Sequence, residues 1–77
     1  MPSDLPVDYN DFVSKVASHC ILFVEPIQIS EVMKLLVKKT NGFDRNSWMW
    51  DMYHRQALTP SETATEIVNE LIAELVR

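Results

Sequence analysis

The sequence is poor in glycine, cysteine and long apolar runs. Gly42 is the single glycine in 77 residues, and because sheets of many short strands need turns with positive φ, this scarcity favours helices. Cys20 is the single cysteine, which excludes an internal disulfide and indicates a reducing compartment. The longest apolar run, residues 20–24, is far below the roughly 20 residues that span a bilayer. We therefore expect a soluble cytoplasmic protein with no membrane partner, and the acidic first residues do not resemble an export signal.

Basic residues are also few. The net charge is −4, and the acidic groups gather at the two ends of the chain. Residues 1–25 carry four acids against Lys15, residues 59–77 carry four glutamates against Arg77, and the middle is weakly basic. Generic binding to a phosphate backbone depends on clustered lysine and arginine. Nucleic acid is therefore a disfavoured partner.

The overall amino-acid composition is that of a globular protein. Apolar residues make up 47% of the chain and charged residues 23%, which is not the balance of a disordered tail. We predict an all-α fold, a compact bundle of about four short helices that forms a single domain over residues 1–77, with an irregular N-terminal arm at residues 1–7. The predicted helices span residues 8–23, 30–40, 46–58 and 60–76.

The last helix has the clearest start signal. Thr59 stands at the N-cap, Pro60 at the first helical position and Glu62 three residues after the cap, which is a capping box. From there the apolar residues recur at the i, i+3, i+4, i+7 spacing of one helical face. They are Ala64, Ile67, Val68, Leu71, Ile72, Leu75 and Val76.

The other helices have weaker boundaries. Ser30 is the predicted N-cap of the second helix, Gly42 suits its left-handed end, and its apolar face comprises Val32, Met33, Leu36 and Val37. The first helix places on one face Tyr9, Phe12, Val13, Val16, Cys20 and Phe23. Residues 20–29 remain open between a helix end and an extended segment. The candidate caps of the third helix are Asp44, Asn46 and Ser47.

The third segment, "NSWMWDMYHRQ", crowds large side chains together. At about 100° per residue, one arc contains Trp48, Met49, Met52 and Tyr53, and we predict that they belong to the core. Trp50 projects away from this arc beside His54. It either makes a second packing contact within the chain or is an exposed anchor for a partner, since tryptophan is enriched at binding hot spots.

Two features of the last helix are candidate partner surfaces. Glutamates recur every four residues at Glu62, Glu66, Glu70 and Glu74, and we expect a ridge opposite the apolar face, offset only by Arg77. The ridge is either a solvated face or a docking surface for a basic partner. Together with Ile67, the residues Ile72 and Val76 widen the apolar arc to roughly 180°, more than an edge helix needs. Either the first helix covers the excess within the chain, or Ile72 and Val76, together with Trp50, form an exposed patch that marks a homodimer or partner interface.

No pattern indicates catalysis. His54, His19 and Cys20 have no partner at metal-ligand spacing, and there is no glycine-rich phosphate loop or nucleophile motif. We expect no enzyme, no catalytic or metal residues and no cofactor.

These observations favour a small acidic protein-binding module, such as an adaptor, an inhibitor, an immunity-type protein or a regulator, that occupies a surface of another protein. The alternative is a nucleic-acid-binding regulator with a helix-turn-helix variant in residues 30–58. In that alternative the residues that face the duplex are Lys38, Lys39, Arg45, Arg55 and Gln56.

Overall fold

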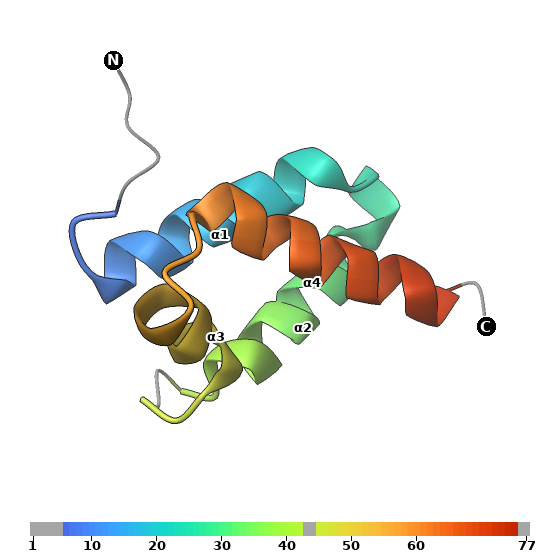
Figure 1. Cartoon of the computed structure of the whole chain (residues 1–77). Coiled ribbons are helices and arrows are strands. Elements are labelled where there is room, and N and C mark those ends of the chain that lie inside the picture. The colour runs from blue at the N-terminus through green and yellow to red at the C-terminus, as the bar shows by residue number, and fades with distance from the viewer. Residues whose placement is uncertain (1–5, 43–44, 76–77) are drawn as a thin grey trace, which may run out of the picture.

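The computed structural model describes residues 6–42 and 45–75, and throughout these ranges the regular structure is helical. This confirms the predicted all-α bundle of short helices. The elements are α1 (Tyr9–Phe23), a 3₁₀ turn (Pro26–Gln28), α2 (Ile29–Thr40), α3 (Trp48–Trp50), a π-helical segment (Asp51–Arg55) and α4 (Pro60–Leu75). In Figure 1, α1 and α4 run from left to right, α2 returns from right to left, and α3 lies beside the start of α1. Most of the predicted arm at residues 1–7 lies outside the described residues.

The buried side chains of the described residues form one core to which all four helices contribute. The fully or almost fully buried apolar residues are Phe12, Val16 and Cys20 of α1, Val32 and Leu36 of α2, Met49 of α3, and Ala64, Ile67, Val68 and Leu71 of α4. The predicted apolar faces of α1 and α4 are therefore confirmed at their centres. Phe23 is a correction, since it is 45% exposed and stacks on His19. The last turn of α1 projects beyond the core, so helical periodicity continues there without a neighbour to cover it.

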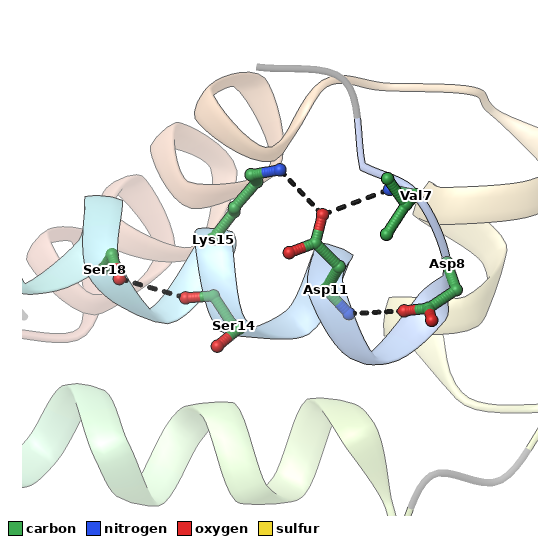
Figure 2. A network of polar contacts seen from close by, with 6 residues as sticks. All are labelled: Val7, Asp8, Asp11, Ser14, Lys15 and Ser18. Carbon is green, nitrogen blue, oxygen red and sulfur yellow. Dashed lines mark hydrogen bonds and ion pairs between the residues drawn. The ribbon is translucent and has the colours of Figure 1, made fainter. Parts of the chain in front are cut away.

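The starts of α4 and α1 are held by side chains. At α4 the Glu62 N–H donates to Thr59 Oγ1 over 3.2 Å and the Thr59 N–H donates to Glu62 Oε1 over 3.0 Å, as the capping box predicts. At α1 the Asp11 N–H donates to Asp8 Oδ1 over 2.8 Å. Figure 2 shows that the Asp11 carboxylate also bonds Lys15 Nζ at 2.7 Å and the Val7 N–H at 3.1 Å. These bonds lower the pKa of Asp11, and the bond to Lys15 has the largest effect.

The start of α2 differs from its prediction. Helix α1 ends at Phe23, and Val24 is extended, with φ −118° and ψ 162°. The 3₁₀ turn then leads directly into α2 at Ile29, without a side-chain cap. The predicted N-cap Ser30 is wrong, because a preceding turn already supplies helical backbone at that position. At the other end, Asn41 is left-handed at φ 46° and its N–H donates to the Val37 carbonyl, while Gly42 follows at φ 67°.

The third helix is shorter and less regular than predicted. Ser47 is its cap, since Ser47 Oγ accepts from the Trp50 N–H over 3.2 Å, whereas Asp44 lies outside the described residues. A single α-helical turn widens into the π-helical segment, which ends at Arg55. Ala57 has a left-handed φ of 52°, and the Leu58 N–H donates back to the Met52 carbonyl over 3.0 Å. The predicted end near residue 58 is wrong because Ala57 leaves the helical conformation.

Candidate functional site

The aromatic cluster of α3 and the π-helical segment is mainly core. Met49 is fully buried, and the partly buried side chains packed against the core include Trp48, Met52 and Tyr53. This agrees with the prediction for all four residues.

Trp50 packs within the chain. Its half-buried ring meets the Tyr9 ring edge-on, with centroids 4.9 Å apart, and the Arg45 guanidinium lies over it at 5.4 Å. His54, which is exposed, lies at 5.4 Å from the indole. Of the two interpretations offered by the sequence, these contacts favour internal packing. The Tyr9 ring and the Arg45 guanidinium each cover part of the indole, which leaves less of it to anchor a partner.

The four glutamates of α4 do not form one ridge opposite the core. Glu62 belongs to the capping box, and Glu66 is exposed. Glu70 Oε1 lies 3.1 Å from Lys39 Nζ of α2, so the expectation that only Arg77 offsets the glutamates is wrong. Glu74 lines a shallow cleft with Lys34 and Lys38. Four residues advance a helix by about 400°, so the series drifts by about 40° per step and its later members reach α2.

The apolar excess of α4 is smaller than predicted. Ile67 is fully buried, and Ile72 is 48% exposed. Val76 lies outside the described residues. Ile72 is therefore the part of the predicted patch that the structure exposes, and it is the one large hydrophobic side chain of α4 among the exposed residues described.

An apolar hollow lies between α1 and α2. This α1–α2 groove has a volume of about 190 Å³ and is lined by Val13 and Ala17 of α1 and by Met33, Leu36, Val37 and Thr40 of α2. Met33 is 41% exposed and Val37 68% exposed. Both lie on the predicted apolar face of α2 but outside the core, because α1 and α2 do not close over them.

The sequence contained a signal for this groove. From Leu35 through Val32 and Leu36 to Val37, the apolar arc of α2 spans roughly 200°. An edge helix needs little more than about 100°. The apolar arc of α2 is therefore wider than the arc of roughly 180° predicted for the last helix, and the groove lies where α2 has this excess.

The chemically reactive groups are few. Cys20 is fully buried with Sγ 3.9 Å from the Ala64 carbonyl oxygen, and burial raises the pKa of its thiol to about 11. It is therefore a protonated, small apolar side chain, as predicted. In the part of the chain that the structure describes, no three His, Cys, Asp or Glu side chains are placed to hold a metal ion.

Several cations required by the nucleic-acid alternative have partners within the chain. Lys39 Nζ bonds Glu70 and lies 4.7 Å from the Trp48 ring centre. Arg55 lies 3.4 Å from Asp51, and Arg45 lies over Trp50. The helix that would enter the groove of a duplex is one α-helical turn followed by the π-helical segment.

Comparisons of the chain with protein-family models, with curated proteins and with solved structures found no match. Among the described helices, none has the length and apolar character needed to cross a membrane. The surface of the molecule is therefore the basis for a functional proposal.

Proposed function

We propose that this chain is a small cytoplasmic protein-binding module, of the adaptor, inhibitor or regulator kind, whose docking surface is the α1–α2 groove. The proposal rests on the groove, where Met33 and Val37 are exposed beside the half-buried Val13 and Ala17. Burial of apolar surface stabilises a complex by roughly 25 cal/mol per Å² removed from water. Contiguous exposed apolar surface is therefore typical of interaction sites.

The charges of the molecule support this proposal over nucleic-acid binding. Phosphate contacts need cations that are free to pair with the ligand. Here Lys39, Arg45 and Arg55 have partners within the chain. A cytoplasmic location is part of the proposal, and the single buried thiol of Cys20 is compatible with a reducing compartment.

A photo-reactive amino acid at position 37 tests the proposal. The full chain, with this residue in place of Val37, is irradiated in an extract of the source cells, and the adducts are identified by mass spectrometry. The matched control carries the same residue in place of Ile72, another exposed aliphatic side chain, which lies on α4. We expect a discrete protein adduct from position 37 and little from position 72. Equal labelling from both positions, or none from position 37, would contradict the proposal.

A further inference from the structure

On the basis of the proposed function, we infer that the partner segment that occupies the α1–α2 groove is an amphipathic helix whose apolar stripe is flanked by acidic side chains. The apolar side chains of this helix pack between α1 and α2, and its carboxylates pair with Lys34 and Lys38 of α2. The shape of the groove walls and the charge beside them support this kind of partner.

The walls of the groove are two antiparallel helices (Figure 1). The α1 wall consists of Val13 and Ala17. At the i, i+3, i+4, i+7 spacing of a helical stripe, the α2 wall consists of Met33, Leu36, Val37 and Thr40. This stripe is about 10 Å long, or about two helical turns. A third helix matches such a seat, because side chains at the same spacing on its own surface can lie between the two walls.

Other modes of peptide recognition do not suit these walls. A partner that binds as a β-strand needs an open sheet edge, and the regular structure of the described residues is helical. A proline-rich segment needs a groove lined by aromatic side chains, and none of the described residues that line this groove is aromatic. Met33 instead supplies a flexible thioether side chain, which adapts to the apolar anchors of a helix.

The charge beside the groove is basic, although the chain as a whole carries −4. Around the axis of α2, Lys34 and Lys38 lie about 60° and about 100° from Val37, on the side away from the core. The Lys34 side chain is 72% exposed. Lys38 is exposed and has no ion pair among the described residues. Lys34 and Lys38 therefore place positive charge along the outer edge of the α2 wall.

Two acids lie close to these lysines, but neither neutralises both of them. The Glu31 carboxylate lies 3.5 Å from Lys34 Nζ, and both side chains are more than half exposed, so water weakens this pair. Glu74 of α4 lines the cleft on the other side of the lysines, and no ion pair joins it to them among the described residues. Carboxylates beside the apolar stripe of a partner helix therefore gain orientation and association rate from Lys34 and Lys38, whereas basic flanks are repelled.

Fluorescence anisotropy with two designed, labelled peptides and the full chain tests the inference. Both peptides have about 14 residues, or about four helical turns, with a helix-stabilising cross-link and leucine at i, i+3, i+4 and i+7. One peptide carries glutamate beside the leucines and the other carries lysine at the same positions. In about 0.1 M salt we expect the glutamate peptide to bind at least about fivefold more tightly, and the preference should shrink in about 1 M salt. The net charge of −4 favours the lysine peptide, so a preference for glutamate reports the local cations.

Paired substitutions locate the source of the preference. Lys34→Gln combined with Lys38→Gln should abolish it, because both cations beside the groove are removed. The matched control is Thr65→Glu combined with Asn69→Glu, which changes the net charge by the same amount at exposed positions of α4 and should keep the preference. Val37→Asn should weaken binding of the glutamate peptide at least about fivefold, because an amide does not replace the apolar contact. Thermal unfolding checks that every variant is folded.

Four outcomes would overturn the inference: equal binding of the two peptides, tighter binding of the lysine peptide, no binding of either up to about 1 mM, or a preference that survives the loss of both lysines. Photo-labelling from position 37 in the cell extract separates these failures from that of the proposed function. If the peptides fail and position 37 still labels a protein of different sequence, the acidic helix is removed and the proposed function stands. An adduct with a second copy of this chain also removes the acidic helix. Failure of the peptides without any labelling removes both.

Discussion

Helices α4 and α2 carry similar apolar arcs and bury them to different extents. On α4 the residues Ile67, Val68 and Leu71 are buried and Ile72 alone among the described large apolar side chains is substantially exposed. On α2, Val32 and Leu36 are buried while Met33 and Val37 are exposed. The difference lies in the neighbours, because α1 and α2 leave a groove between them whereas α1 and α4 meet along the core. An apolar pattern that would allow a helix face to be buried does not ensure that another helix covers that face.

The largest expected difference in unfolding free energy is between a buried residue of α4 and an exposed residue of α2. Leu71→Ala removes a buried side chain at the centre of the α4 stripe and should lower the free energy of unfolding by about 2–5 kcal/mol. Val37→Ala on α2 removes a side chain that is 68% exposed, and its effect should stay within about 0.5 kcal/mol. Urea unfolding of both variants at low concentration measures the difference. Similar losses would mean that the two helices do not differ in burial.

The second prediction compares the two helix starts. Thr59→Ala removes the hydroxyl that accepts from the Glu62 N–H at the start of α4 and should cost about 0.5–2 kcal/mol. Ser30→Ala, at the position where the sequence predicted a cap for α2, should cost far less because α2 starts without a side-chain cap. Urea midpoints of the two variants decide the matter. A larger loss from Ser30→Ala would restore the original prediction for α2.

The third prediction compares two buried threonines. Thr63 of α4 is fully buried, and its Oγ1 has no hydrogen-bond partner among the described residues. Thr63→Val keeps the shape and removes the unsatisfied hydroxyl, so it should stabilise the chain by about 1 kcal/mol. Thr40 of α2 is also buried, but its Oγ1 donates to the Val37 carbonyl over 3.0 Å.

Thr40→Val is the matched control for this gain. It loses a hydrogen bond and should leave stability unchanged or lower it by up to about 1 kcal/mol. Thermal melts of both variants give the comparison. A gain from Thr40→Val equal to that from Thr63→Val would show that hydrogen bonding of the hydroxyl is not the cause.

The smallest effect concerns the start of α1, where a carboxylate has both a cationic and a backbone partner. The pKa of Asp11 lies below its ordinary value of 3.8, because of its bonds to Lys15 and to the Val7 N–H. Its contribution to stability is therefore present above about pH 4 and is lost as the pH falls through the folded-state pKa. Asp11→Asn should flatten the acid side of the stability curve, and so should Lys15→Met, which removes the first of the two partners. Urea midpoints at pH 7 and pH 3 measure this, and an acid response as steep as that of the parent in both variants would contradict it.

The sequence predicted the helices best where local signals agreed. The capping box of Thr59 and Glu62 and the apolar stripe of α4 are both present in the structure. Prediction was weakest where a neighbouring segment changed the local rule. The 3₁₀ turn removed the need for a cap at Ser30, and the left-handed Ala57 shortened the third helix. Neither Ser30 nor Ala57 stands in a local sequence pattern that predicts its conformation in the structure.

The candidate surfaces were predicted less well than the helices. The sequence leaves Trp50 open between internal packing and an exposed anchor, and it predicts no partner for Glu70 except Arg77. Their partners in the structure, Tyr9 and Lys39, lie 41 and 31 positions away in the sequence. Contacts between residues so far apart in the sequence produce no periodic pattern from which they could be predicted. Met33 and Val37, by contrast, were placed on the apolar face of α2 from the periodicity of that helix alone.

By itself the sequence determined the helical class, the start of α4 and the set of side chains that could be buried, since these depend on spacing within a few turns. Only the tertiary structure decided which members of that set are covered and which charges are paired. Coverage depends on how closely two helices approach, and that distance is fixed by the packing of the whole core. The α1–α2 groove exists because Val13 and Ala17 lie opposite Met33 and Val37 without filling the space between them.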